Sequence, residues 1–213
     1  MNKIETEANL LILYSALFCE PEEDLFHNLQ ILDELEKLQF SLISGNCDTI
    51  GKLKKVCSEY SFQELLVDYT KLFIGPFEAV AHPYSSIYLN DGVSTLYNET
   101  TLWVENFYNS CGYNFGDVIK DMPDHIAVEL EFLYVLKHSQ LKSIAENNPE
   151  KEQKVIDQYF CFLANHFNIW APMFSEKIIS RAENKYYITL YQYFNCFIEN
   201  YLIPETALHK ISK

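Results

Sequence analysis

The apolar residues of this chain recur at steps of three and four, which is the spacing of one helix face and not of a β-strand. Near the N-terminus, Leu10, Leu11, Tyr14 and Phe18 follow this spacing. The alternation typical of strands is nearly absent. Because 213 residues are also enough to bury a substantial core, the sequence predicts an all-α fold, a single helical-bundle domain.

Proline, glycine and capping residues divide this pattern into about nine expected helices. Pro123 is expected to open one of them, capped by Asp121 or Met122, and Pro172 another. We expect residues 113–122 to be a hinge joining an N-terminal lobe of about residues 1–112 to a C-terminal lobe of about 123–213. The expected helices cover about residues 5–18, 22–42, 48–59, 61–73, 95–111, 123–145, 150–169, a stretch from 172, and 185–202.

The six cysteines are scattered, with no pair at the spacing of a zinc site, which favours free thiols. The first residues lack the basic flank of a secretory signal, and no run approaches the ~20 apolar residues that a membrane helix needs. We therefore expect a cytoplasmic protein without stable membrane insertion.

The net charge of −14 comes from 30 acidic and 16 basic residues, and Arg181 is the only arginine. Nucleic-acid binding requires cations for the phosphates, so this class of function is disfavoured. The charge is compatible with a cationic partner, and equally with acidity that serves only solubility.

An aromatic connection follows the helix that ends at Gly75-Pro76, where glycine accepts a left-handed backbone and proline lacks the amide hydrogen. Ordinary loops are polar, but this one is rich in aromatic and aliphatic side chains. It is therefore either packed under the domain or presented to a partner. Its large apolar residues are Phe77, Val80, Tyr84, Ile87 and Tyr88.

A polar segment at Asp124-His125 is the second candidate region. Asp124 suits a helix cap or a binding role, and His125 suits a structural role or a hydrogen bond to a partner. His125 and Glu129 stand four residues apart, but no second metal-binding helix complements them. His166 is expected on one helix face together with Trp170, a face that is typical of core packing.

The sequence contains no nucleophile with a recognisable base, no phosphate-binding loop and no dinucleotide-binding motif. We therefore expect no catalytic residues, no bound metal and no cofactor.

Five ordered motifs resemble the TorD/DmsD-type chaperones. These motifs are residues 72–76, 83–89, 123–130, the segment of His166, Trp170 and Phe174, and residues 201–204. The resemblance implies an all-helical cytoplasmic chaperone that binds the twin-arginine signal peptide, the apo form of a molybdoenzyme catalytic subunit, or both. Such a chaperone supports cofactor insertion and delays export until the client has folded.

The resemblance also implies a peptide-binding surface, and the protein is expected as a monomer or a homodimer. One alternative is an assembly chaperone of the nitrate-reductase type, whose client peptide lacks twin arginines. Others are a nucleotide-binding or hydrolysing protein, and a scaffold in which the aromatic loop is buried core. The implied peptide-binding residues are Phe73, Gly75, Pro76, Pro83, Tyr84, Ser86, Tyr88, Asp124 and His125.

Overall fold

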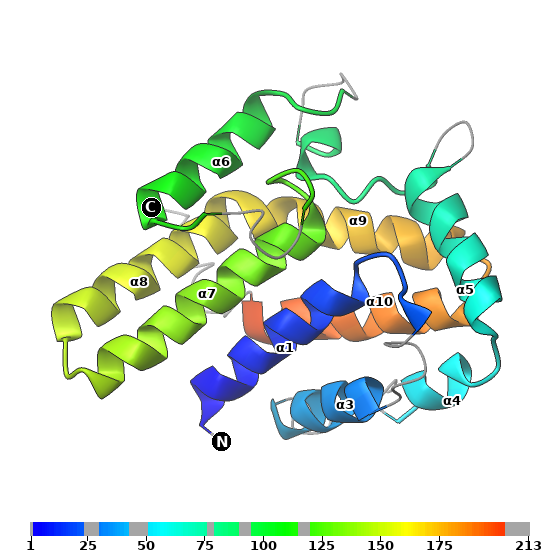
Figure 1. Cartoon of the computed structure of the whole chain (residues 1–213), viewed down its shortest axis with the longest axis horizontal. Helices are drawn as coiled ribbons and strands as arrows, with labels where there is room; N and C mark the ends of the chain where they lie inside the picture. The colour runs from blue at the N-terminus through cyan, green and yellow to red at the C-terminus, as the bar shows by residue number, and fades with distance from the viewer. Residues whose placement is uncertain are drawn as a thin grey trace. The chain divides into compact units, whose positions relative to one another are not determined.

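The computed structural model describes residues 2–23, 30–42, 51–75, 79–89, 95–114 and 120–202. Within these ranges the regular structure is helical, and the extended pairing is one isolated bridge between Tyr84 and His125 (Figure 1). The all-α prediction is confirmed. Contacts divide the chain into two compact units, Met1–Phe18 with Tyr84–Ala171 and Cys19–Pro83 with Pro172–Lys213.

The first unit is built around the long helix α7. Its helices are α1 (Lys3–Leu17), α6 (Glu99–Cys111), α7 (Ile126–Ala145) and α8 (Pro149–Phe162). Both α1 and α8 pack along α7 (Figure 1). Aromatic rings fill the space between α6, α7 and α8: the ring of Phe132 lies 4.5 Å from that of Tyr108 and 5.0 Å from that of Phe162, centroid to centroid. These buried rings form the aromatic core between the three helices.

Helix α1 is attached to α7 by polar as well as apolar contacts. Its first turn is closed by a capping box between Asn2 and Glu5. Farther along, the Nζ atom of Lys137 on α7 lies 2.7 Å from Oε2 of Glu7 and 4.0 Å above the centroid of the Tyr159 ring. A largely buried lysine is therefore paired with a carboxylate and an aromatic face.

The second unit contains shorter helices and two π-helical turns. Its elements are α3 (Gln30–Leu42), α4 (Leu53–Cys57), α5 (Phe62–Tyr69), η1 (Thr70–Ile74), α10 (Lys185–Phe197) and η4 (Ile198–Leu202). Residues distant in sequence are joined by buried hydrogen bonds. The Nε2 atom of Gln39 donates to the backbone carbonyl of Tyr193 at 2.7 Å. The hydroxyl of Tyr187 donates to the backbone carbonyl of Leu65 at 2.9 Å.

Both proline-based predictions of helix starts are wrong. Helix α7 begins at Ile126 and is capped by His125, because Pro123 and Asp124 form a turn and His125 is held in an extended bridge to Tyr84. Pro172 lies inside α9 (Asn168–Arg181), which continues from the π-helical turn η3 (Leu163–Phe167). A proline inside a helix removes one amide donor, but α9 continues past Pro172 to Arg181.

The two compact units divide the chain at positions other than the hinge expected at residues 113–122. Residues 115–119 of that segment lie outside the described ranges. The division into N-terminal and C-terminal lobes stays a prediction.

Candidate functional site

The loop that starts at Tyr84 is attached to the residues that precede α7. The backbone N–H of Ser85 donates to the carbonyl of Asp124 at 3.0 Å, and that of Ser86 donates to Oδ2 of the same residue, also at 3.0 Å. Ser85–Ile87 form a single 3-10 turn, η2. Asp124 therefore satisfies two backbone donors at the start of this turn, and it is fully buried.

Three polar atoms in this cluster are buried with no hydrogen-bond partner among the described residues. They are Oδ1 of Asp124 and the Oγ atoms of Ser85 and Ser86. A buried polar atom without a partner costs about 1–3 kcal/mol. The cluster thus retains hydrogen-bonding capacity beyond what the loop itself uses.

The acidic group that solvent reaches at this site is Asp121, which the sequence suggested only as a helix cap. The hydroxyl of Tyr84 donates to its Oδ1 atom at 3.1 Å, and the N–H of Met122 donates to the same oxygen at 2.7 Å. Burial and the nearby carboxylates of Asp121 and Asp124 raise the pKa of Tyr84, so its hydroxyl stays protonated as a donor. In the sequence, Asp121 is only an acidic residue beside an expected turn. Many surface residues have this pattern, so it does not mark a site.

His125 is buried and acts as the N-cap of α7. Its Nδ1 atom accepts the N–H of Ala127 at 3.1 Å, and its ring contacts that of Tyr84 edge-on at 5.2 Å. Burial lowers the pKa of His125, although Asp121 and Asp124 act in the opposite direction. A neutral imidazole is what the cap requires, because a protonated Nδ1 cannot accept a hydrogen bond.

Tyr88, at the other end of the turn, packs on a buried polar cluster. Its ring lies 5.7 Å from that of Trp170. The indole Nε1 of Trp170 donates to Oε2 of Glu129 at 2.9 Å, and Nε2 of His166 lies 2.7 Å from Oε1 of Glu129. Glu129 is therefore part of an internal hydrogen-bond network, and the described residues contain no group of three or more possible metal ligands.

The remaining predicted site residues belong to the second unit. Phe73 is buried among aromatic residues, its ring centroid 6.0 Å from that of Tyr187. Gly75 ends η1 with a φ of 66° and donates its N–H to the carbonyl of Thr70. Pro83 is buried, and Pro76 lies outside the described residues. The structure thus brings together Tyr84, Ser86, Tyr88, Asp124 and His125 in the first unit, whereas Phe73, Gly75 and Pro83 belong to the second.

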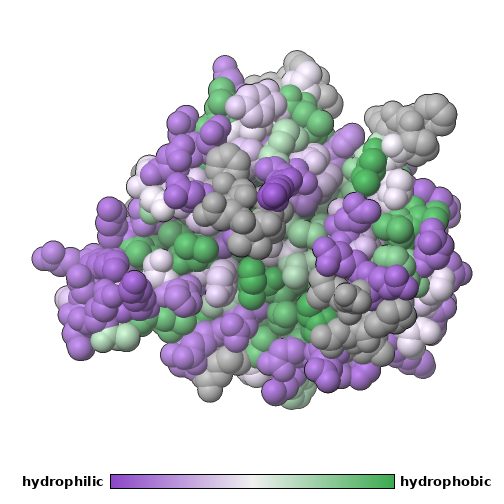
Figure 2. Space-filling view, in the orientation of Figure 1, coloured by the Kyte–Doolittle hydropathy of each residue, from purple (hydrophilic) through white to green (hydrophobic). Residues whose placement is uncertain are grey.

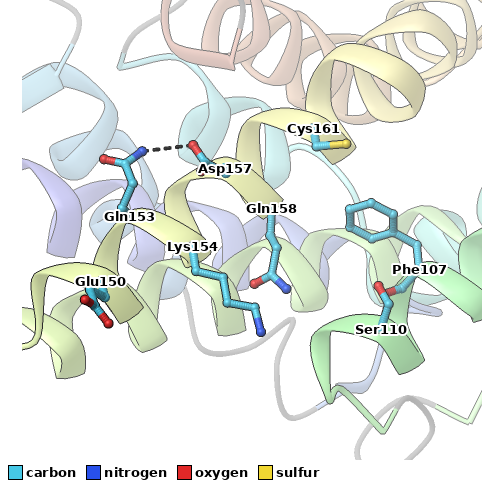
Figure 3. Close-up of a pocket in the computed structure, with 8 residues that line it drawn as sticks. All are labelled: Phe107, Ser110, Glu150, Gln153, Lys154, Asp157, Gln158 and Cys161. Carbon is cyan, nitrogen blue, oxygen red and sulfur yellow. Dashed lines mark hydrogen bonds between the residues drawn. The ribbon is translucent and has the colours of Figure 1, made fainter.

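A shallow cavity of about 640 Å³ lies between α6 and α8, away from the loop (Figure 3). Phe107 and Ser110 of α6 face Cys161 across its end, and the rest of its wall is mostly polar. None of the predicted site residues lines it.

The described helices include none that is both long and apolar enough to cross a membrane. On the face drawn in Figure 2, hydrophilic side chains separate smaller hydrophobic patches.

Fold and site together define an all-α protein that holds an aromatic loop against the capped start of its longest described helix. Residues 41–176 match the model of the family described as nitrate reductase delta subunit. Since this match covers more than half of the chain, the protein belongs to that family, and within it to the TorD/DmsD type of maturation chaperone.

Relatives with assigned names agree with this membership. The chaperone protein TorD of Vibrio parahaemolyticus is 27% identical over 203 residues, covering 88% of this chain and 89% of that protein. A Haemophilus influenzae protein named "probable Tat proofreading chaperone DmsD" is 29% identical over 142 residues, covering 67% and 62%. The expectation of a chaperone and not an enzyme agrees with these names.

One solved structure supports the fold. A proposed redox enzyme maturation protein from Archaeoglobus fulgidus superposes with a TM-score of 0.59 at 24% identity, covering 90% of this chain and 93% of that one. At this identity the likeness concerns the fold alone.

Proposed function

We propose that this protein is a cytoplasmic chaperone that binds the twin-arginine signal peptide, and through it the unfolded catalytic subunit, of a molybdoenzyme. Family membership supports the class of function. The observation that carries the peptide-binding part is the exposed carboxylate of Asp121, which is held beside the ring of Tyr84 by a hydrogen bond of 3.1 Å.

A twin-arginine signal combines a basic pair with an apolar stretch, and the loop offers chemistry for both. Asp121 is positioned to accept a guanidinium through charge-assisted hydrogen bonds, which are stronger than neutral ones. The half-buried rings of Tyr84 and Tyr88 supply apolar contact area. The net charge of −14 increases the rate at which a cationic peptide encounters the protein.

In this proposal Asp124 and His125 do not contact the peptide but hold the loop in its conformation. Both are buried, and each already accepts a backbone N–H, so the first contact with arginine falls to Asp121. Ser86 is fully buried as well, and its backbone N–H is held by Asp124, so it contributes by fixing the loop conformation. Phe73, Gly75 and Pro83 belong to the second unit, and their role in peptide binding, like that of Pro76, stays a prediction of the family resemblance.

Peptide capture also provides a way to delay export. A signal segment enclosed by the chaperone is unavailable to the export machinery, and release restores it once the client has folded. Binding of this kind is noncovalent and needs no cofactor.

Calorimetric titration with a synthetic signal peptide tests the proposal. We expect Asp121→Asn to weaken binding about tenfold, the effect of losing roughly one charge-assisted hydrogen bond, and Tyr84→Ala to weaken it further. Asp157→Asn is the matched control, because Asp157 is an exposed acid on α8 in the same unit. Undiminished binding by both site variants, with Asp157→Asn unchanged, would refute the mapped site.

The family description favours a second candidate, an assembly chaperone of the nitrate-reductase type. Its client peptide would lack the arginine pair. A peptide with both arginines replaced by glutamine distinguishes the two candidates: equal affinity for both peptides supports the assembly role. Sedimentation of the same samples gives the oligomeric state, for which monomer and homodimer both stay open.

A further inference from the structure

We infer that Glu129 is a positioning residue for the proposed peptide-binding loop, acting through Trp170 on Tyr88. This inference rests on the proposed function for its role in binding, but its structural part can be tested without any peptide. The three residues belong to one compact unit, and Glu129 and Trp170 are fully buried.

Both carboxylate oxygens of Glu129 are occupied by side-chain donors. Oε1 lies 2.7 Å from Nε2 of His166, and Oε2 accepts from Nε1 of Trp170 at 2.9 Å. Burial raises the pKa of Glu129, and the contacts with His166 and Trp170 oppose that effect. Apolar side chains could fill this space at lower cost, so the polar network serves orientation more than packing energy.

The orientation that the network fixes is that of the indole ring. Packing confines a buried indole, and the hydrogen bond from Nε1 to the carboxylate adds a directional constraint that apolar contacts do not provide. Glu129 is rigid because it lies in the first turn of α7 and is also held by His166.

The indole in turn supports the loop. The rings of Trp170 and Tyr88 lie 5.7 Å apart with an interplanar angle of 33°. Asp124 binds the N–H groups of Ser85 and Ser86 at the start of the loop, Nδ2 of Asn98 donates to the carbonyl of Ser86 at 3.1 Å, and Trp170 supports Tyr88 after the 3-10 turn. Loss of the contact with Trp170 should leave the others intact and loosen the end of the turn.

The hydrogen-bond network of Glu129 also contacts a partly exposed residue, because buried His166 stacks on Trp103. The ring of Trp103 on α6 stacks on the His166 ring at 5.1 Å and 29°, and Trp103 is 38% exposed. Trp103 and Trp170 are the two tryptophans of the chain, so intrinsic fluorescence reports on this network. In a Trp103→Phe background, excitation that is selective for tryptophan reports on Trp170 alone.

The test compares Glu129→Gln with Glu131→Gln, which removes a similarly buried carboxylate two positions along the same helix. In the Trp103→Phe background we expect Glu129→Gln to shift the emission of Trp170, while Glu131→Gln leaves it unchanged. In the unliganded protein, hydrogen exchange at the amides of residues 87–89 should become several-fold faster with Glu129→Gln only, while the amides of Ser85 and Ser86 stay bonded to Asp124. If Glu129→Gln does not fold, Trp170→Phe removes the same N–H donor while keeping an aromatic ring.

Unchanged exchange in residues 87–89, in a folded Glu129→Gln or Trp170→Phe variant, would overturn the inference. Peptide titration then distinguishes a failure of this inference from a failure of the proposed function. If the wild-type protein does not bind the signal peptide, the proposed function fails, while the exchange result still decides whether Glu129 holds the loop. If the wild type binds, we expect Glu129→Gln to weaken binding about tenfold, and equal affinity would overturn the positioning role.

Discussion

The Oδ2 atom of Asp124 accepts a hydrogen bond at 3.0 Å from the backbone N–H of Ser86, a residue 38 positions earlier in the chain. The carbonyl of Asp124 accepts the neighbouring N–H of Ser85. One buried residue therefore ties the aromatic loop to the start of α7, and the loop depends on it for its conformation.

Replacing Asp124 should destabilise the protein through this pair of contacts. Asp124→Ala leaves the buried N–H of Ser86 without its acceptor, which is expected to lower the free energy of unfolding by about 1–3 kcal/mol. Asp124→Asn keeps an acceptor oxygen and should cost less. Urea denaturation measures both values, and an Asp124→Ala variant as stable as the wild type would contradict the assignment.

The stability of the protein should fall on acidification through His125. Burial keeps the pKa of His125 below its usual value of about 6.5, so the unfolded chain binds this proton first. The stabilising effect of the neutral imidazole is therefore complete above about pH 6.5 and decreases as the pH falls toward the folded-state pKa. Protonation also removes the Nδ1 acceptor that caps α7.

His125→Asn isolates this effect, because asparagine is a good N-cap and does not titrate. Thermal melts between pH 5 and 8 should show a shallower pH dependence for this variant than for the wild type. Parallel curves for the two proteins would argue against His125 as the titrating group.

The Lys137–Glu7 ion pair should be sensitive to the loss of one partner and tolerant of the loss of both. Lys137→Met leaves the carboxylate of Glu7 largely buried without its closest cation and is expected to lower the free energy of unfolding by about 3–5 kcal/mol. The double variant Lys137→Met with Glu7→Leu should recover most of that loss. A double variant no more stable than the single one would show that the pair is not the cause.

Phe73 should contribute to the stability of the fold, because its ring lies in the core; its predicted role in peptide binding does not by itself imply such an effect. Phe73→Ala removes a buried ring that packs against Phe174, Tyr187 and Tyr191, so we expect a loss of about 3–5 kcal/mol. Ile74→Ala is the control, because the neighbouring Ile74 is 56% exposed and its truncation should change stability by less than about 0.5 kcal/mol. Similar effects of the two substitutions, measured by urea denaturation, would rule out a core position for Phe73.

The fold could be predicted from the sequence because helical spacing is a local property. The apolar face of α1 and the capping box of Ser61 and Glu64 at the start of α5 both involve residues within a few positions of each other. The start of α7 could not be predicted in this way. Pro123 favours a helix start locally, but the bridge between Tyr84 and His125 overrides that preference, and it depends on a segment far away in the sequence.

The candidate site was predictable only in part for the same reason. The aromatic loop and the Asp124-His125 pair stand out as patterns, and the structure places Tyr84 against His125 and Ser86 against Asp124. Asp121 did not stand out, since its importance comes from a contact with Tyr84. The partners of Glu129 were likewise hidden, because His166 and Trp170 reach it from another helix.

The packing of α1 on α7 also bears on how the protein is made. A ribosome adds about 5–20 residues per second, so α1 leaves the ribosome roughly ten seconds before Ala145 completes the helix it packs against. During that interval Leu10, Leu11 and Tyr14, all buried in the finished protein, have no α7 to cover them. The apolar face of α1 therefore spends a large part of synthesis without the helix that covers it in the folded protein.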